Sequence, residues 1–268
     1  LLESLRLVAH LWREASFPAT EFAELQREQI TGLQAQLDNP EAVSGDALLS
    51  HFNTYPPGDP RHYVPVGERI EQLRKITLDD LRRYHRQLIG TARGEIALVG
   101  DFDPATVEQE IGRLFADYLS PAPYQRLERE FRPVAPRRMV IDTPEKENAY
   151  LRARLDFRLR DDDPDAAALY VANNLFGGYG GLSNRLIDRL RQKDGLSYSA
   201  GSTLSMGARH YLSSWNVEIM AAPQNIARAE QAFSEELLRV RRDGFTDQEI
   251  AEAKKGMVEA RTLVRSQD

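Results

Sequence analysis

The chain of 268 residues contains no cysteine. This absence excludes disulfide bonds, thiolate zinc sites and cysteine nucleophiles, and it fits a bacterial-type periplasm as well as the cytoplasm, so the compartment stays open. Long apolar runs are missing too, since none approaches the roughly 20 residues that cross a bilayer. The leucine-rich start, LLESLRLVAHLWRE, carries acids and bases and is typical of an amphipathic helix rather than a signal peptide. We therefore expect no membrane span.

An excess of basic residues is also lacking. The net charge is −6 and the sequence pI is about 5.5. Because nucleic-acid binding draws its affinity from a basic surface, this composition argues against a nucleic-acid partner. The densest basic stretch, residues 126–138, is interrupted by acids and prolines and is typical of a solvated linker. With 41% hydrophobic and 28% charged residues, the chain is expected to be globular.

Metal and serine-hydrolase signatures are absent. No two of the five histidines have the i, i+4 spacing with which one helix face binds zinc, and neither H-E-x-x-H nor H-x-x-E-H occurs. His10 and Glu14 are one helical turn apart, but such a pair is more typical of a solvated surface. The acidic run 161–165 lacks the glycine and distal glutamate of a calcium loop, and helix capping explains it. No G-x-S-x-G motif occurs. We expect no metal site within this chain.

Hydrophobic periodicity predicts helices before and after a central linker, with strands in both parts. Helices are expected over residues 1–12, 18–37 and 40–52, from the N-cap Thr77 to about 90, and from the cap Asp103 onward; 53–67 is expected to be a proline-rich loop, and 94–100 a buried strand. The linker is expected within 119–137. After it, strands are expected over 148–157, 195–205 and 211–221, and helices over 164–176, after the glycine segment, and over 223–242.

One short motif occurs twice. FPATEFAELQRE, starting at Phe17, matches FTDQEIAEAKKG, starting at Phe245, with identical Phe, Glu, Ala and Glu residues at a constant offset of 228. A looser echo links residues 98–111 to 217–233. The two echoes keep the same order, so we expect two copies of one α+β unit, with the chain beginning inside the first and ending inside the second.

The glycine segment, residues 177–181 (GGYGG), does not fit a phosphate cradle. Serine stands where a dinucleotide fingerprint has its third glycine, a helix precedes the segment, and no Gly-Lys-Ser/Thr follows. A plain helix connection explains it: Gly177 ends one helix in the left-handed conformation and Ser183 caps the next.

Arg191 and Tyr198 follow this segment, seven residues apart and on either side of a stop at Gly195. Both side chains could point toward the glycine segment and offer a fixed cation and a phenolic donor to a peptide carbonyl. A solvated Arg191 and a core Tyr198 fit the pattern as well. The residues alone leave both interpretations open.

Residues 175–199, LFGGYGGLSNRLIDRLRQKDGLSYS, resemble the glycine-rich segment and the following SRL…LR…GL.YS of peptidase family M16, which includes pitrilysin, insulin-degrading enzyme and mitochondrial processing peptidase. Residues 17–43, 63–88 and 94–115 follow the order of the later part of one M16 repeat unit. The resemblance therefore covers nearly the whole chain. It implies an α+β fold of two related α/β sandwich units with antiparallel-rich sheets, a LuxS/MPP-like metallohydrolase fold, in which 1–125 and 126–268 are the two incomplete units.

The resemblance also implies a role. M16 peptidases hold zinc in one half, and this chain departs from that half because Ala35 stands where its later glutamate ligand is expected. The chain therefore resembles the C-terminal, non-zinc half of a long zinc metalloendopeptidase. The zinc cofactor would belong to the N-terminal half of the same polypeptide, the substrate would be a peptide or unfolded protein, and the fragment alone is expected to be inactive.

Site residues carried over from the family follow the same resemblance. Arg191 and Tyr198 match the catalytic arginine and tyrosine of that half, and four glycines border the substrate: Gly177, Gly178, Gly180 and Gly181. Two alternatives stay open, a non-catalytic M16-like structural subunit and a peptide-binding module.

Overall fold

The structure is a computed structural model that describes residues 1–178 and 184–265. The chain forms two compact units. The first unit comprises residues 1–34 and 67–127, and the second comprises 35–66 and 128–268. The predicted repeat boundary at 125/126 concerns ancestry rather than compactness, and it remains a prediction.

Helices make up the regular structure of the first unit within the described residues: α1 (Leu2–Arg13), most of α2 (Ala19–Gln36), most of α4 (Val66–Lys75), α5 (Leu78–Leu88) and α6 (Pro104–Phe115). Two of the predicted caps are confirmed. Thr77 accepts a hydrogen bond from the Asp80 amide at 3.2 Å, and Asp80 accepts one from the Thr77 amide at 2.9 Å, which makes a reciprocal capping box. Asp103 caps α6 by accepting from the Thr106 amide at 2.9 Å.

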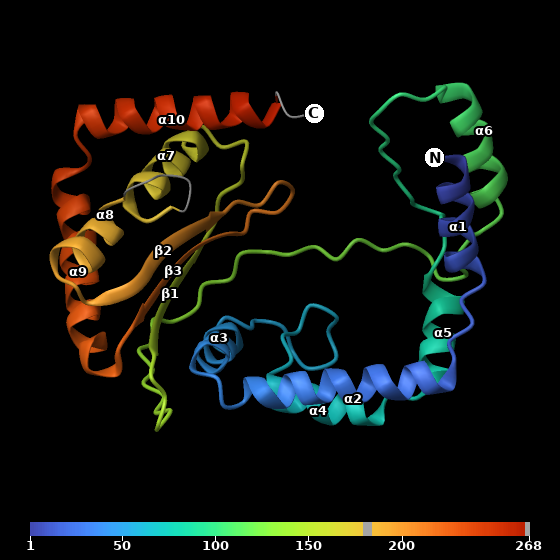
Figure 1. Ribbon diagram of the computed structural model, residues 1–268, viewed down its shortest axis with the longest axis horizontal. Helices are drawn as coiled ribbons and strands as arrows, with labels where there is room; N and C mark the ends of the chain where they lie inside the picture. The colour runs from blue at the N-terminus through green and yellow to red at the C-terminus, as the bar shows by residue number, and fades with distance from the viewer. Residues whose placement is uncertain (179–183, 266–268) are drawn as a thin grey trace. The chain divides into compact units, whose positions relative to one another are not determined.

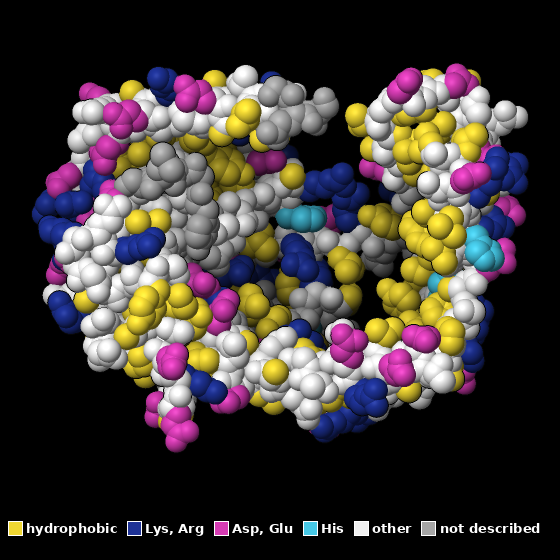
Figure 2. Space-filling model, in the orientation of Figure 1, with side chains coloured by type: hydrophobic (Ala, Val, Ile, Leu, Met, Phe, Trp, Pro, Cys, Tyr) yellow, Lys and Arg dark blue, Asp and Glu magenta, His cyan; other side chains and the backbone are white. Residues whose placement is uncertain are grey.

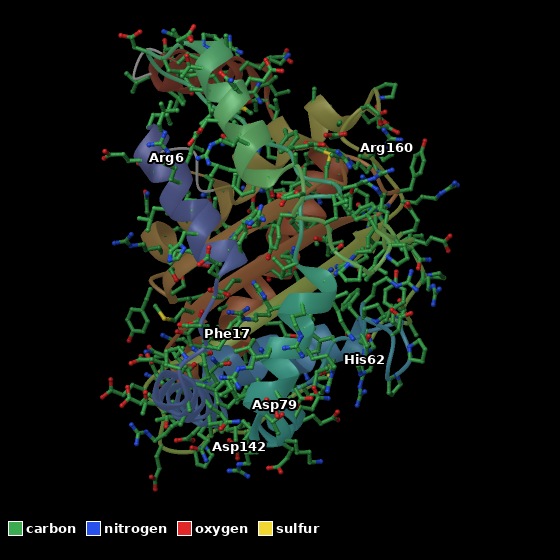
Figure 3. All side chains as sticks on the ribbon, turned by 90° about the vertical axis from the view of Figure 1, so that its right-hand side faces the viewer. Arg6, Phe17, His62, Asp79, Asp142 and Arg160 are labelled. Carbon is green, nitrogen blue, oxygen red and sulfur yellow. The ribbon has the colours of Figure 1, made fainter. Side chains whose placement is uncertain are left out.

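α1 packs against α6 through an ion pair and an aromatic contact. Arg6, labelled on α1 in Figure 3, donates to Glu110 across 2.6 Å. At the last residue of α6, the Trp12 and Phe115 rings meet edge to face at 6.2 Å. Other apolar side chains of α1 stay exposed, and hydrophobic side chains gather over α1 and α5 on the face shown in Figure 2. A patch of this kind marks a surface that suits another apolar surface.

Two sequence predictions for this region are wrong. Residues 94–100 form no strand, and Val99 is 96% exposed. A strand needs a neighbouring strand for its backbone N–H and C=O groups, and the described residues of the first unit contain none. The expected loop 53–67 is too long, because α4 begins at Val66. Val66 and Ile70 lie one turn apart and are both buried, while the Val66 amide donates to Asp46 at 2.9 Å.

The second unit is built on a three-stranded antiparallel sheet in the order β1-β3-β2 (Figure 1). Its strands are β1 (Ala149–Phe157), β2 (Ser197–Ser205) and β3 (Ser213–Ala221), and Ala149 pairs with Ala221 while Phe157 pairs with Ser213. All three strands were expected. The helices of this unit are α3 (Pro40–His51), α7 (Ala166–Phe176), α8 (Arg185–Ile187), the π-helix η1 (Asp188–Lys193), the 3-10 turn η2 (Pro223–Asn225), α9 (Ile226–Asp243) and α10 (Asp247–Arg265).

The core of the second unit lies on one face of this sheet. Its buried side chains come from α7, α8, η1, α9 and the strands: Phe176, Leu186, Leu190, Leu196, Ala200, Val217, Ile219, Ala229, Ala232 and Phe233. Leu151 and Ala153 of β1 pack against this cluster, as their alternation predicted, although Leu155 of the same predicted face is exposed. The opposite side of β1 contacts α3, where Arg152 donates to Glu41 at 3.3 Å. The α+β class is confirmed.

The repeated motif begins a long helix in both places. α2 starts at Ala19 and α10 at Asp247, so the two starts differ by 247 − 19 = 228 residues, the offset of the sequence echo. In each case another helix precedes, α1 before α2 and α9 before α10. The repeated motif therefore has the same local structure in both places, and the duplication stays a prediction.

Candidate functional site

The glycine segment leaves α7 through a fixed turn. The amides of Gly177 and Gly178 both donate to the Asn173 carbonyl, at 3.0 and 2.8 Å, and the Gly177 carbonyl accepts from the Ser202 amide on β2 at 2.7 Å. The predicted left-handed conformation of Gly177 is wrong, because its φ is −159°. Close approach explains the glycine instead: a Cβ there would lie 2.7 Å from Ser202 Oγ and 2.8 Å from Leu186 Cδ1.

Asn184 is the first described residue after the glycine segment. Its side-chain oxygen accepts from the Ile187 amide at 2.9 Å and caps α8, and its Nδ2 donates to the Gly178 carbonyl at 3.2 Å. The predicted cap Ser183, and the predicted substrate-binding residues Gly180 and Gly181, lie outside the described residues. Gly177 and Gly178 are buried, so packing accounts for them, and their contact with substrate remains a prediction.

The predicted helix after the glycine segment starts as α8 and continues as the π-helix η1. The Asp194 amide donates to the Arg189 carbonyl at 3.1 Å, five residues back, which is the π-type spacing. Leu186 and Leu190 are fully buried and pin this helix to the core. Gly195 then takes a φ of +61°, the left-handed value expected of a stop residue, and β2 begins.

Arg191 and Tyr198 lie on the two sides of this turn. The Leu196 amide donates to the Leu190 carbonyl at 2.7 Å and ties the start of β2 to the helix. The pairing with β3 slips between Ser197 and Ser199, so Tyr198 is the extra residue of a β-bulge. A bulge re-aims a side chain, and Tyr198 is 59% exposed. A core position for Tyr198 is therefore excluded in this structure.

Arg191 is exposed too. Neither Arg191 nor Tyr198 has a hydrogen-bond or ion-pair partner in the part of the chain that the structure describes. The structure thus brings the two residues to one turn without joining them to each other. Both side chains are available to a ligand.

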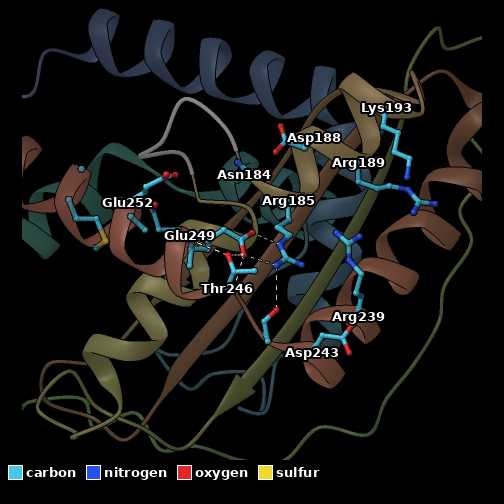
Figure 4. A pocket seen from close by; sticks show the side chains of 16 residues that line it. Asn184, Arg185, Asp188, Arg189, Lys193, Arg239, Asp243, Thr246, Glu249 and Glu252 are labelled. Atoms are coloured by element: carbon cyan, nitrogen blue, oxygen red, sulfur yellow. Dashed lines mark hydrogen bonds and ion pairs between the residues drawn. The ribbon is translucent and has the colours of Figure 1, made fainter.

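Arg185 and Arg189 of the same helix are bound instead. Arg185 holds Glu249 with two hydrogen bonds, at 2.8 and 2.9 Å, and reaches buried Glu236 at 3.5 Å, as Figure 4 shows for Glu249. The Arg185 hydrogen bonds lower the pKa of Glu249 to about 2, although its partial burial acts in the opposite direction. The same contacts raise the pKa of Arg185.

This ion network escaped the sequence reasoning. In the sequence, Glu249 stands out only as a member of the repeated motif, and Glu236 belongs to no motif, although it is a charged residue on the buried face of α9. A glutamate on the apolar stripe of a helix is the signal that could have indicated a buried ion pair. A cavity of about 1020 Å³ lies beside the network, and its lining includes Arg185, Glu249, Asn174 and Met257 but neither Arg191 nor Tyr198.

The described residues do not offer a zinc site. They contain no group of three or more His, Cys, Asp or Glu side chains arranged to hold a metal ion. His10 and Glu14 form an exposed pair at 3.4 Å. In the acidic run, Asp163 accepts from the Asp165 amide at 3.0 Å. α7 starts only at Ala166, and its N-cap residue Asp165 makes no side-chain capping hydrogen bond, so the capping expected of this run is wrong. The described residues therefore lack a donor set for zinc, the cofactor that the family resemblance assigns to the other half.

None of the described helices combines the length and the apolar character needed to span a membrane.

Comparison with known proteins decides the family. Residues 75–257 match the family model described as Peptidase M16 inactive domain. The chain belongs to the peptidase M16 family. The M16 resemblance stated from the sequence is thereby confirmed, and the description of the matching model agrees with the expected non-zinc half.

Of two curated relatives of this M16 chain, one is named a probable inactive metalloprotease and the other a zinc protease. It is 23% identical over 239 residues to the probable inactive metalloprotease YmfF of Bacillus subtilis, covering 89% of the chain and 54% of that protein. It is 26% identical over 254 residues to an uncharacterized zinc protease of Mycobacterium tuberculosis, covering 88% of the chain and 52% of that protein. The chain therefore spans about half the length of the curated relatives it matches.

Solved structures show the same fold. A peptidase M16 inactive domain from Pseudomonas fluorescens matches with a TM-score of 0.76 at 22% identity, over 95% of the chain and 60% of that structure. A protease from Helicobacter pylori matches with a TM-score of 0.71 at 16% identity, over 98% of the chain and 62% of that structure. At these identities the likeness concerns the fold.

Proposed function

We propose that this chain is the substrate-contacting, non-zinc part of an M16 zinc metallopeptidase, with Arg191 and Tyr198 as the residues that touch the peptide. One observation carries the proposal. Within the described residues, two arginines of the helix 185–193 are bound in ion pairs, whereas Arg191 and the nearby Tyr198 are exposed and unpartnered. A fixed turn that holds a free cation and a free phenol suits a ligand with carbonyl groups.

The chemistry of the two side chains fits a peptide. The guanidinium of Arg191 presents several N–H donors in a planar fork and can hold a backbone carbonyl oxygen. The hydroxyl of Tyr198 can donate a hydrogen bond to the oxygen that gains negative charge when a peptide carbonyl is attacked. A preorganised donor of this kind contributes about a hundredfold or more in rate. Zinc, in this proposal, belongs to the N-terminal half of the full-length protein.

The glycine segment has a supporting role in the proposal. Hydrogen bonds from Ser202 and Asn184 to the carbonyls of Gly177 and Gly178 hold its two described residues. The segment would form a rim beside the substrate, and Gly180 and Gly181 would border it directly.

The test replaces the two side chains in the full-length protein. Tyr198→Phe should lower turnover of a fluorogenic peptide by about a hundredfold, and Arg191→Gln should lower it comparably, both with an unchanged melting temperature. Tyr84→Phe is the matched control, since Tyr84 is 57% exposed on α5. Wild-type turnover in Tyr198→Phe would remove this residue from the proposed site.

A second function is a peptide-binding subunit without catalysis. It is favoured by the B. subtilis relative, which is named a probable inactive metalloprotease. The inverted H-x-x-E-H motif in the full-length sequence separates the two functions. A full-length protein that binds peptides without cleaving them, and whose affinity falls in Arg191→Gln, would support the second function.

A further inference from the structure

Arg189 links three parts of the second unit. Its Nε donates to the Asp194 carboxylate at 2.7 Å, and its NH2 group donates to Glu235 of α9 at 2.8 Å. Its backbone carbonyl also accepts from the Asp194 amide at 3.1 Å. Asp194 is the residue between the π-helix and Gly195. Arg189 therefore bonds twice to the turn that separates Arg191 from Tyr198, and once to a helix of the core.

The turn needs such a restraint. A π-helix is rarer than an α-helix and occurs as short stretches within helices, held by its surroundings. Gly195, with its positive φ, adds a backbone position of high conformational freedom directly after it. The bulge at Tyr198 removes one residue from the β-ladder. The placement of Tyr198 relative to Arg191 therefore depends on few backbone hydrogen bonds.

We propose that Arg189 is a positioning residue, whose bridge between Asp194 and Glu235 sets Tyr198 relative to Arg191. This inference rests on the proposed function for the roles of Arg191 and Tyr198. An arginine suits the task, because its planar fork holds two carboxylates from different elements at once, which a lysine ammonium does less rigidly.

The neighbouring Arg185 has a different role. Its partner Glu236 is 1% exposed and is also bound by Arg239 at 2.7 Å, so the loss of Arg185 removes one of two cations from a buried carboxylate and also frees Glu249. That loss threatens the fold itself. The carboxylates that bind Arg189 are both partly solvated. Removal of Arg189 should therefore release the turn and keep the unit folded.

The experiment measures order and chemistry in the full-length protein. Arg189→Gln should speed hydrogen exchange of the amides of residues 194–198 by about tenfold, the amide of Leu196 included, and keep the melting temperature within about 2 °C. Turnover should fall about tenfold with KM within about twofold, because the donor is misplaced rather than removed. Asp194→Asn should act alike, and Arg189→Lys should recover part of the loss.

Two comparisons separate positioning from a general structural effect. Arg242→Gln, which breaks a surface pair with neighbouring Asp243, should leave exchange and turnover unchanged. In a Tyr198→Phe background, Arg189→Gln should lower turnover by less than about threefold, because the residue it positions is already disabled. For a full-length protein that binds peptide without cleavage, peptide affinity replaces turnover.

The outcomes are distinct. Exchange and turnover in Arg189→Gln that match those of Arg242→Gln would overturn the inference. A full tenfold loss in the Tyr198→Phe background would overturn it too, since Arg189 would then act by another route. Faster exchange at 194–198 in Arg189→Gln, with unaltered turnover in Tyr198→Phe, would support the bridge and overturn the proposed function.

Discussion

Asn184 bonds to Gly178 across the glycine segment, with 3.2 Å between Nδ2 and the carbonyl oxygen. The same side chain caps α8 through the Ile187 amide at 2.9 Å. Asn184 is 5% exposed, so both bonds are shielded from water. One residue therefore starts the helix that carries Arg191 and also binds Gly178, the second residue of the glycine segment.

Two substitutions of Asn184 should distinguish the contributions of these two hydrogen bonds to stability. Asn184→Ala loses both and should lower the free energy of unfolding of the second unit by about 2 kcal/mol. Asn184→Ser keeps a good cap but is too short to reach Gly178, so a loss of about 1 kcal/mol is expected. Urea unfolding followed by Trp215 fluorescence, in a Trp12→Phe background, measures both. Equal losses in the two variants would show that the bond to Gly178 contributes nothing.

Gly177 should not tolerate a side chain. A Cβ would lie within 3.0 Å of both Ser202 and Leu186, and part of that contact is with strand backbone that cannot move aside. Gly177→Ala should therefore destabilise the second unit by about 1–3 kcal/mol. Gly256→Ala is the matched control, because a Cβ there meets nothing within 4 Å and alanine favours the α10 helix. A neutral Gly177→Ala would contradict the packing explanation for this glycine.

Acid should weaken the second unit through Glu249. Its folded pKa of about 2 lies below the usual glutamate value near 4.3, so the folded state binds fewer protons between these values. The stabilisation is complete above about pH 4.3 and is lost as the pH falls toward 2. Because about a third of the carboxylate side chain is exposed, about 1–2 kcal/mol is expected rather than the full linkage value.

The measurement is the free energy of unfolding between pH 7 and pH 3. Glu249→Gln should be less stable at neutral pH and should lose less stability on acidification than the wild type. Glu259→Gln changes an exposed carboxylate on the same helix and should keep the wild-type profile. Parallel profiles for Glu249→Gln and the wild type would contradict the role of the Arg185 bond.

The parts of the fold that depend on local chemistry could be predicted from the sequence. Thr77 and Asp103 identified two helix starts, because a cap is a matter of residue type at one position. Alternation in residues 148–157 identified β1 for a similar reason. The prediction of a strand at residues 94–100 was wrong. Their apolar pattern is consistent with a strand, but a strand forms only beside a neighbouring strand.

The candidate site also combines features that the sequence predicts with features that depend on distant parts of the chain. Arg191 and Tyr198 were predicted from their spacing together with the family resemblance, yet their exposure depends on the π-helix and the β-bulge. The π-helix adds a residue to a helical turn, and the β-bulge adds a residue to a strand. Predictions from hydrophobic periodicity assume regular helices and strands, so they miss both. The ion partners of Arg189 were out of reach for another reason, since Glu235 lies 46 residues away in the chain.

The fluorescence of Trp215 reports on the turn that follows α7. Its indole N–H donates to the Asn173 side-chain oxygen at 3.0 Å, and the same oxygen accepts from the Ser202 hydroxyl at 2.8 Å. Asn173→Ala would leave both donors without this acceptor. Because Ser202 is buried, we expect a loss of about 2–4 kcal/mol in the free energy of unfolding. Water entering beside the freed indole should shift the Trp215 emission to the red in a Trp12→Phe background. An unshifted emission spectrum in a folded Asn173→Ala variant would show that the indole finds another buried acceptor.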